Sequence, residues 1–461
     1  MIRAKLPRMN GRPLDPRAVR PCLGGALLAL ALALAWAGPA PAAPGMASGL
    51  ADAAIDPAHA ASAPSSAGLA DAGSGADADA TGLPSLPDPR GPHAIGTLLM
   101  DWTDAEREEL WTEDPADRRR LVVQFWYPAV ERPVRVPAPY VLRYPQMREN
   151  LDRFWMCPFP TMPTHAALEP VVLEHAGPLP VVLLSHGMNS SRTVYSALAE
   201  ELASHGYVVA LIDHPHWGPG VAFENGHTVD YDESMPGQMS LGADRMDERV
   251  QEGIATMADD QAFVARMLRT MTGARRVNVR RLARQLDLDR VAVAGHAMGG
   301  MAAVRAAYTY SFFRAAVTFD GYAWHAAGIS PLGSPAAPSP KPLLVLLSET
   351  GMRGDSLAFA RRHLDAFRAP RIVRLRGTRP ATVTDVGFLR AGGGATEDVA
   401  AHRRVTAAVR AFLDEHLRGQ GFFDDSLTRI AGAERLDLGG MLGEATRTAG
   451  HPAAEALDAA P

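Results

Sequence analysis

Residues 291–300 read Val-Ala-Val-Ala-Gly-His-Ala-Met-Gly-Gly, and this stretch decides how the chain is expected to fold. A short β-branched and alanine run leads into Gly295, and an apolar helical pattern follows from Met298. This order predicts a strand, a sharp turn and a helix, the junction at which the pattern Gly-x-Ser-x-Gly presents a nucleophilic serine. Both glycines are present, but Ala297 stands where the pattern has serine. The stretch therefore predicts a turn built to carry a nucleophile that lacks the nucleophile.

Short apolar runs alternate with helical patterns on both sides of this turn. Most runs are continuously apolar, as expected for strands that helices cover on both faces. The expected strands are 121–127, 181–185, 207–212, 291–294, 315–319, 343–347 and 372–375. The expected helices are 191–205, 248–271, 298–309, 355–368 and 396–417. Strands that alternate with helices predict an α/β class with a mostly parallel central sheet, and the turn narrows this to an α/β-hydrolase fold.

The two ends of the chain differ in composition from this block. Residues 1–42 combine basic side chains, an apolar run of about 15 residues and a final Ala-Pro-Ala, which is typical of a secretory signal peptide. A retained membrane anchor is the alternative. Residues 43–90 are rich in Ala, Gly, Ser, Pro and Asp and predict a disordered linker. We expect one α/β-hydrolase domain at 91–418 and a weakly ordered tail at 419–461.

Charge and cysteine content narrow the compartment and the partners. Residues 1–42 carry six basic side chains and one acidic side chain, so without them the net charge changes from −5 to −10. An acidic chain is a poor nucleic-acid binder, which needs a basic face. Cys157 is then the only cysteine, which excludes an intrachain disulfide, and we expect it to pack among apolar neighbours. The sequence predicts a secreted or periplasmic protein without a nucleic-acid partner.

Three further positions complete the expected site. A strand that ends in His186-Gly187 is where an α/β hydrolase places its first oxyanion donor, here the amide of Met188, and the amide of Met298 is the second. Asp320 follows the strand after the elbow helix, at the place of the catalytic acid. The base should follow the strand at 372–375, yet no histidine lies between His363 and His402. Nucleophile and base are therefore both missing, while backbone donors survive the loss of side chains.

Several segments in combination resemble the platelet-activating factor acetylhydrolase family of secreted and lipid-associated α/β hydrolases. Thr103-Asp104 precedes the segment 121–129, and Thr164-His165-Ala166 precedes the segment 181–187. The segments continue with 192–197 before 205–215 and with 286–290 before the elbow. The resemblance covers about 95–418. It implies phospholipid or short-chain ester hydrolysis and a lipid or ester ligand, with no cofactor.

The resemblance also assigns positions. It places Ala297 at the nucleophile, Asp320 at the acid, and Met188 and Met298 at the oxyanion residues. The loop after the last strand resembles Gly-x-x-His-x-x-Phe-x-Asp in the family, which puts Pro380 at the base. Because Ala297 and Pro380 depart from the family, we expect an inactive or severely impaired member. The alternatives are a working ester hydrolase with other groups and a cell-envelope interaction protein that does not use the site.

Other histidines of the sequence are candidates to replace the missing catalytic base. His296 is the x before the serine position, and we expect its side chain to point away from the site and pack. His186 is expected to have a structural role. His214 and His216 suggest a metal, but no third ligand stands at a recognised spacing, so no metal is expected. His325 follows Asp320 closely enough to be a candidate replacement base.

An aromatic and methionine-rich stretch at 137–163 bears on partners. In the family the equivalent insertion resembles a cap near the site and a surface for lipid, which allows membrane-surface association. An ordinary hydrophobic cover over the sheet is an equal alternative.

Overall fold

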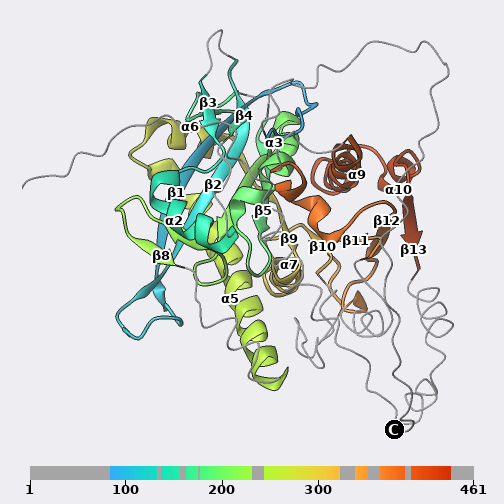
Figure 1. The fold of residues 1–461 in the computed structure, drawn as a ribbon. Coiled ribbons are helices and arrows are strands. Elements are labelled where there is room, and N and C mark those ends of the chain that lie inside the picture. The colour runs from blue at the N-terminus through green and yellow to red at the C-terminus, as the bar shows by residue number, and fades with distance from the viewer. Residues whose placement is uncertain are drawn as a thin grey trace, which may run out of the picture.

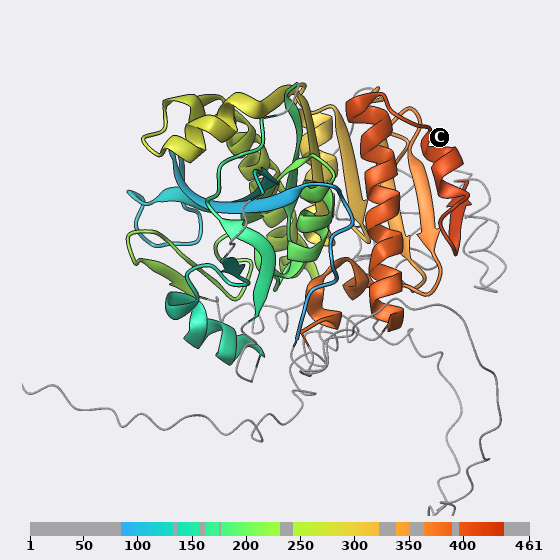
Figure 2. The same ribbon diagram turned by 90° about the horizontal axis from the view of Figure 1, so that it is seen from above.

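The continuous apolar runs of the sequence form the centre of one large twisted sheet (Figures 1 and 2). The computed structural model describes residues 84–131, 136–155, 162–174, 177–230, 243–321, 338–350, 364–389 and 396–437. Within these ranges the main sheet has 11 strands in the order β13-β12-β11-β10-β9-β5-β6-β2-β1-β4-β3. They are β1 (Ala94–Glu108), β2 (Arg118–Ala129), β3 (Pro137–Pro139), β4 (Pro163–Leu168), β5 (Leu179–Ser185), β6 (Val208–Asp213), β9 (Leu286–His296), β10 (Ala315–Phe319), β11 (Leu343–Ser348), β12 (Arg371–Leu375) and β13 (Ala433–Leu436).

The middle of the sheet is parallel, and its margins are mixed, because β1 pairs in parallel with β4 while the other marginal pairs are antiparallel. β6, β5, β9, β10, β11 and β12 pair in parallel, whereas β2 pairs antiparallel with both β1 and β6, and β13 pairs antiparallel with β12. A separate hairpin pairs β7 (Gly220–Ala222) with β8 (Thr228–Asp230). Because parallel strands end at one edge, the turns after β5, β9, β10 and β12 gather there, which is where open α/β sheets place their sites.

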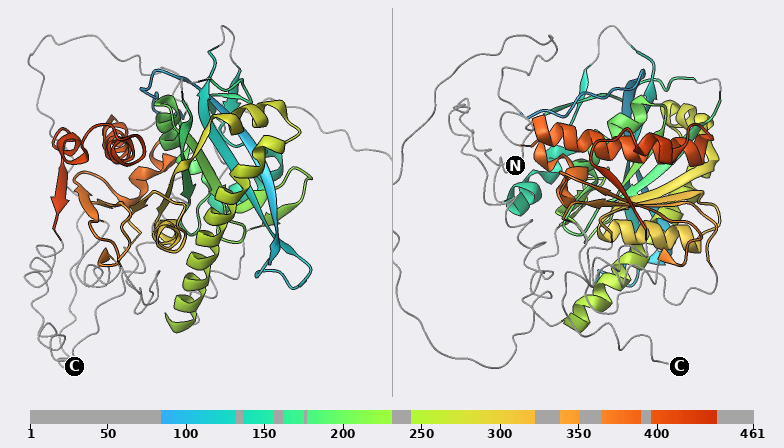
Figure 3. Two further views of the ribbon diagram at one scale, coloured as in Figure 1. Left: turned by 180° about the vertical axis from the view of Figure 1, so that it is seen from behind. Right: turned by 90° about the vertical axis from the view of Figure 1, so that its right-hand side faces the viewer.

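Helices cover both faces of the sheet. They are α2 (Tyr144–Trp155), η2 (Arg192–Tyr195), α3 (Ser196–Ser204), α5 (Ala243–Thr270), η3 (Met271–Gly273), α6 (Val277–Gln285), α7 (Met298–Thr309), η4 (Pro380–Val383), η5 (Asp385–Gly387), α9 (Thr396–Leu413), η6 (Asp414–Arg418) and α10 (Phe423–Leu427). Side chains of α5, α6 and α7 belong to one apolar cluster, and those of α3, α9 and α10 to another. Figure 3 shows α7 and α9 on opposite faces of the sheet.

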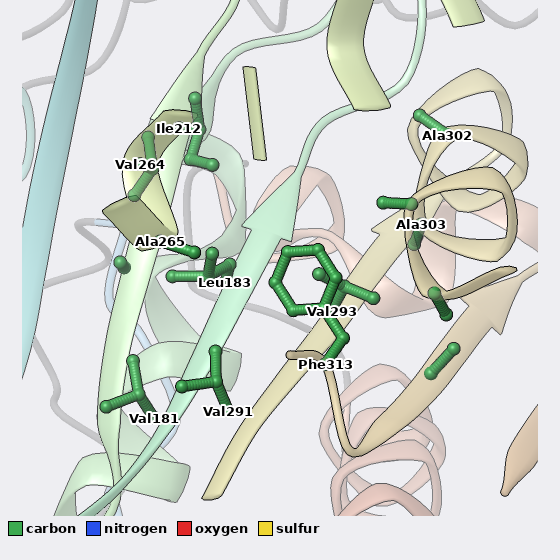
Figure 4. Close-up of a cluster of buried hydrophobic side chains, with 14 of the residues drawn as sticks. Val181, Leu183, Ile212, Val264, Ala265, Val291, Val293, Ala302, Ala303 and Phe313 are labelled. Carbon is green, nitrogen blue, oxygen red and sulfur yellow. The ribbon is translucent and has the colours of Figure 1, made fainter. Parts of the chain in front are cut away.

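The alternation of side chains along each strand explains why the runs are apolar throughout. Val181 and Leu183 of β5 point into the cluster with α5 and α7, shown in Figure 4. Val182 and Leu184, one residue further along in each case, point into the cluster with α3 and α9. All four are essentially inaccessible to solvent. A strand buried on both faces has no position for a polar side chain, so its sequence shows no alternation.

The seven expected strands and the α/β-hydrolase fold class are confirmed, with boundaries that shift by a few residues. Four of the five expected helices appear as η2 with α3, α5, α7, and α9 with η6, while most of 355–368 lies outside the described residues. The expected signal peptide and the linker as far as residue 83 also lie outside them. None of the helices in the described ranges has the length and apolar content needed to cross a membrane.

Both predicted domain boundaries need correction. Residues 84–90, expected in the linker, pack on the domain: Leu86 is buried, and the Arg90 guanidinium pairs with Glu201 at 3.0 Å. The expected weakly ordered tail begins with structure, because α10 packs Phe423 on α9 and β13 extends the sheet at its edge. Short amphipathic segments of this kind gain their order from the surface they cover, which composition alone does not reveal.

Candidate active site

The turn between β9 and α7 holds Ala297 in a conformation that side chains other than glycine rarely adopt. Its φ is 48° and its ψ is −117°. Such strain costs roughly 1–3 kcal/mol and persists where the surroundings impose it. The Ala297 amide donates to the carbonyl of Phe319 at 2.9 Å. A Cβ added to Gly295 would lie 2.1 Å from the carbonyl oxygen of Gly299, so the tight turn requires that glycine. The backbone of a nucleophile elbow is therefore kept around an alanine.

Two amides beside this turn have no backbone or side-chain acceptor among the described residues. They belong to Met188, which follows the turn after β5, and to Met298, the first residue of α7. Amides in the first turn of a helix lack an intrahelical acceptor and face the positive end of the helix dipole. The two turns touch, because a Cβ added to Gly187 would lie 3.3 Å from the Cβ of Ala297. Both amides are therefore free donors beside the elbow.

The orientation of the Met188 amide is fixed by His186. Nε2 of His186 accepts from the amide of His214 at 3.1 Å, so Nδ1 carries the proton and donates to the carbonyl of Gly187 at 2.7 Å. Burial, with the neighbouring His214, lowers the pKa of His186 to about 3 and keeps the ring neutral. The Gly187 carbonyl and the Met188 amide share one trans peptide and point in opposite directions. Holding the carbonyl toward the ring therefore directs the Met188 N–H away from it.

Asp320 lies directly after β10, buried, with a φ of 47°. One carboxylate oxygen accepts from the amide of Ser348 at 2.9 Å. Burial raises the pKa of Asp320 to about 6, although the hydrogen bonds from Ser348 lower it. Within the described ranges no imidazole, ammonium or guanidinium pairs with this carboxylate. His325, the candidate replacement base, lies outside those ranges.

Pro380 begins the short helix η4 and faces the same small cavity as Asp320. Ser348 and Thr378 also line this cavity, whose free volume is about 10 Å³. That is roughly the space of one water molecule. The structure thus brings the position of the acid and the position of the base together. The pyrrolidine ring of Pro380 offers no atom that could take up a proton.

Asp385 has a structural role that the sequence did not disclose, although it is the last residue of the quoted loop pattern. Its carboxylate accepts from the amides of Ser196 and Ala197 at the start of α3, at 2.9 and 3.1 Å, and from the hydroxyl of Tyr140 at 2.9 Å. Burial raises the pKa of Asp385 to about 7, while these hydrogen bonds lower it. The carboxylate fastens the loop that carries Pro380 to two other parts of the domain.

His296 has a structural role that includes a hydrogen bond as well as packing. Its Nδ1 hydrogen-bonds to the hydroxyl of Tyr195 at 3.0 Å. That hydroxyl also receives the amide of Gly187 at 3.3 Å and lies 3.4 Å from Oγ of Ser190. Burial lowers the pKa of His296 to about 4, so the ring is neutral. His296 is tied to the turn that carries the oxyanion amide because β9 and that turn end side by side.

A second serine–histidine–aspartate chain lies inside the domain. Nδ1 of His214 hydrogen-bonds to Asp260 at 2.8 Å, and Nε2 to Oγ of Ser185, also at 2.8 Å. All three side chains are fully buried. The two hydrogen bonds account for both ring nitrogens of His214 and give this residue a structural role. No sequence spacing announces this chain, because its members come from β5, the turn after β6 and the middle of α5.

Two arginines, the buried Arg119 and the partly exposed Arg107, hold the negative charge of this chain. Arg119 donates to Asp260 at 2.7 Å and to Glu109 at 2.9 Å, and Arg107 donates to the other oxygen of Asp260 at 2.8 Å. Burial opposes the charge of Asp260, but Arg119, the His214 hydrogen bond and Arg107 together hold its pKa well below the ordinary value. Burial also lowers the pKa of His214, against the pull of Asp260. The chain is therefore an ionised carboxylate with a neutral imidazole.

The stretch at 137–163 is largely a hydrophobic cover where the structure describes it. Residues 156–161, which include Cys157, lie outside the described part. The remainder includes β3 and α2, and most of its buried apolar side chains share one cluster with Leu86, Ala197 and Phe388, while Leu142 belongs to a neighbouring cluster. The buried members from this stretch are Tyr140, Val141, Met147, Leu151 and Met162.

A mostly parallel sheet with a strained strand-to-helix turn at its carboxyl edge defines the α/β hydrolases. This fold is shared with a ferulic acid esterase from Streptomyces cinnamoneus, at a TM-score of 0.57 and 25% identity over 76% of this chain and 99% of that one. A sequence model described as platelet-activating factor acetylhydrolase, isoform II, matches residues 156–221 and 267–423. Over these residues, just under half of its length, the chain is similar to the platelet-activating factor acetylhydrolase family.

Individual relatives show the same similarity. A probable 1-alkyl-2-acetylglycerophosphocholine esterase of Arthroderma benhamiae is 26% identical over 301 residues, which are 58% of this chain and 67% of the relative. The platelet-activating factor acetylhydrolase of Bos taurus is 25% identical over 274 residues, 54% of this chain and 60% of the relative. That of Canis lupus familiaris is 24% identical over 55% of this chain and 61% of the relative. The match thus spans about two thirds or less of each relative.

Proposed function

We propose that this protein binds a carboxylic ester, or the carboxylate that ester cleavage releases, at the elbow and does not cleave it. One observation carries the proposal: Ala297 keeps the strained elbow backbone, and the amides of Met188 and Met298 beside it have no acceptor among the described residues. Those amides need no side chain to receive an oxygen. Hydrolysis does need a nucleophile and a base, and the methyl group of Ala297 and the ring of Pro380 provide neither.

The expected loss of activity is large. Removing the serine or the histidine of a serine hydrolase triad costs about 10⁶-fold in turnover, and removing a second member adds little. This corresponds to roughly 8 kcal/mol of barrier. Oxyanion donors and binding alone leave about 10³–10⁴-fold over water. Asp320 cannot replace the missing groups, because its carboxyl is buried with a raised pKa and accepts a hydrogen bond from the Ser348 amide. We infer near-background ester hydrolysis with binding retained.

The ligand class follows from the relatives, one of which is named for a 1-alkyl-2-acetylglycerophosphocholine. We propose that an acetylated or other short-chain glycerophospholipid occupies the elbow of this protein. Calorimetric titration with 1-alkyl-2-acetylglycerophosphocholine should give saturable binding, and chromatography should recover the lipid intact. Ala297→Leu should weaken binding at least tenfold, because the larger side chain fills the space beside the two amides. Cleavage of the lipid, or equal binding by the leucine variant, contradicts the proposal.

Reconstruction of the missing groups tests the loss of catalysis directly. Ala297→Ser with Pro380→His should restore labelling by a fluorophosphonate probe and measurable hydrolysis of 4-nitrophenyl acetate. An imidazole at residue 380 would occupy the space of the proline ring and the adjoining cavity, toward Asp320. Each single variant should stay near background, since each still lacks one essential group.

Two controls frame this experiment. Adding Asp320→Asn to the reconstructed pair should lower turnover by about 10⁴-fold, because the new imidazole would lose its orienting carboxylate. The unchanged protein should not react with the probe at all. Covalent labelling of the unchanged protein would show a nucleophile elsewhere and would overturn the proposal in favour of an active esterase with other groups.

We also infer that residues 1–42 direct export of the chain. The basic start, the short apolar run and the final small residues support this inference. Mass spectrometry of the secreted or periplasmic protein should find an N-terminus near residue 43. An intact N-terminus on a membrane-associated protein would favour the anchor instead.

A further inference from the structure

A hollow of about 350 Å³ lies between α9 and α10, separate from the cavity at Asp320 and Pro380. Its size falls in the range of small-molecule sites. The residues that line it come from one face of α9, from η6, from the following turn and from α10. They are Ala407, Arg410, Ala411, Asp414, Gln420, Gly421, Ser426, Arg429 and Ile430.

The sequence explains why the space is empty. Residues 407, 410, 411 and 414 stand at helical spacing on one face, and two of the four are alanines. A larger side chain at either alanine would narrow the space. The chain then passes through the π-helical turn η6 and bends at Gly419 and Gly421, both with positive φ, before α10 begins. Turns of π-helix inside α-helices occur frequently at functional sites.

Two arginines of this hollow lack an acidic partner. Within the described ranges neither the Arg410 nor the Arg429 guanidinium makes an ion pair or a side-chain hydrogen bond. The carboxylate of Asp414 is already engaged, because it accepts from the hydroxyl of Tyr207 at 2.6 Å and from Arg418 at 3.2 Å. The hollow is therefore lined by two guanidinium groups without an ion pair and by one carboxylate, that of Asp414, which is engaged elsewhere.

Nearby arginines show the contrast. Arg371 and Arg435 both pair with Asp424 of α10, at 3.5 and 3.0 Å. An acidic residue of the same short helix thus neutralises the cations on its other side. Among the described residues, Arg410 and Arg429, which line the hollow, have no such ion-pair partner.

We propose that this hollow is a binding site for a phosphate group. Guanidinium groups bind phosphate oxygens with paired, charge-assisted hydrogen bonds. The side chains of Ser426 and Gln420 line the same space and supply further donors. Ala407, Ala411 and Ile430 provide an apolar wall for the group that carries the phosphate. The site is independent of the elbow and of any ester bound there.

A neighbouring aromatic residue points to one source of this phosphate. Phe422 follows Gly421 at the rim, and 72% of its surface is exposed. An exposed aromatic side chain beside a phosphate site is suited to insertion among lipids. A free phosphate ester would use the hollow without Phe422. The chemistry of the site is the same in both cases.

Titration of the full chain with inorganic phosphate at low salt tests the proposal. Calorimetry should show saturable binding that Arg410→Gln and Arg429→Gln each weaken at least about tenfold. Ala411→Leu should weaken it by narrowing the hollow, with thermal unfolding recorded to verify the fold. Arg403→Gln is the matched control, since Arg403 is exposed on α9 but does not line the hollow. Absence of binding, or equal weakening by the control, overturns the proposal.

Vesicle sedimentation distinguishes the two sources. Retention on phosphatidylglycerol vesicles that both Arg410→Gln and Phe422→Ser reduce would identify a lipid phosphate. Binding of inorganic phosphate without vesicle retention would identify a soluble phosphate ester. Each result supports the phosphate site and names its occupant.

Discussion

Two regions of this molecule, the elbow at Ala297 and the buried Ser185–His214–Asp260 chain, each have some of the features of a serine hydrolase. The elbow has a partly exposed strained turn, two free amides and a strand-end carboxylate, but alanine and proline stand at the reacting positions. The Ser185–His214–Asp260 chain has all three side chains at hydrogen-bonding distance, and every one is fully buried. The elbow keeps the backbone architecture but lacks a nucleophilic serine and a catalytic histidine. The buried chain has a serine, a histidine and an aspartate that no substrate can reach.

The difference shows that a triad is defined by roles and surroundings, not by three residue types. Asp260 is neutralised by Arg119 and Arg107, and Oγ of Ser185 already accepts from the side-chain amide of Gln261 at 2.8 Å. Neither condition suits a nucleophile that must reach a substrate. The buried chain instead supports the end of β5, from which His186 and Gly187 lead to the oxyanion amide. The buried Ser185–His214–Asp260 chain thus supports the backbone beside the elbow, where the triad is incomplete.

The largest expected effect in this comparison is on stability. Asp260→Asn leaves Arg119 buried with one carboxylate fewer, and breaking a buried ion pair typically costs about 3–5 kcal/mol. Urea unfolding at neutral pH should show a loss of this size in the free energy of unfolding. Asp287→Asn is the control, because its pair with Arg290 is partly exposed and should cost less than about 1 kcal/mol. Equal losses would mean that the buried network contributes no more than a surface pair.

A smaller effect, with a defined pH dependence, is expected at Asp320. Its native pKa, about 6, lies above the ordinary value of 3.8, so the native state binds the proton more tightly than the unfolded chain. The stability that the protonated Asp320 carboxyl contributes is therefore fully present below pH 4 and is lost as the pH rises through 6. Asp320→Asn stays neutral and should gain stability over the unchanged protein between pH 4 and 7, by up to about 3 kcal/mol.

Urea unfolding of both proteins across this pH range measures the difference. The buried carboxyl of Asp385, with its raised pKa, is present in both and cancels in the comparison. A difference that does not change with pH would mean that Asp320 has a charged partner outside the described residues.

Much of the fold could be predicted because burial leaves a direct mark on sequence. Strands such as β10 are apolar throughout, so their position follows from composition. β1 was missed because its second half alternates and then becomes polar, as a strand with one exposed face does. β13, Ala433–Leu436, is an edge strand with few apolar residues and acquires its order by pairing with β12.

Some positions of the site could likewise be predicted from the sequence, and others could not. Ala297, Asp320 and the two oxyanion amides follow from short motifs at strand ends, because the parallel sheet brings those ends together. Ser185, His214 and Asp260 are separated by 29 and 46 positions and meet only when α5 packs on the sheet. The bond between His296 and Tyr195 was missed for a related reason. It depends on which way a side chain turns at a junction, and no periodicity encodes that direction.

The smallest expected effect separates the two regions most directly. Ser185→Ala removes the hydroxyl that His214 and Gln261 share, which leaves one buried donor without its acceptor and should cost about 1–3 kcal/mol of stability. In the reconstructed Ala297→Ser, Pro380→His protein the same change should leave fluorophosphonate labelling within about twofold, because a sealed hydroxyl takes no part in attack. Loss of labelling at full folding would instead make the buried serine a participant in the chemistry, and the division between the two regions would fail.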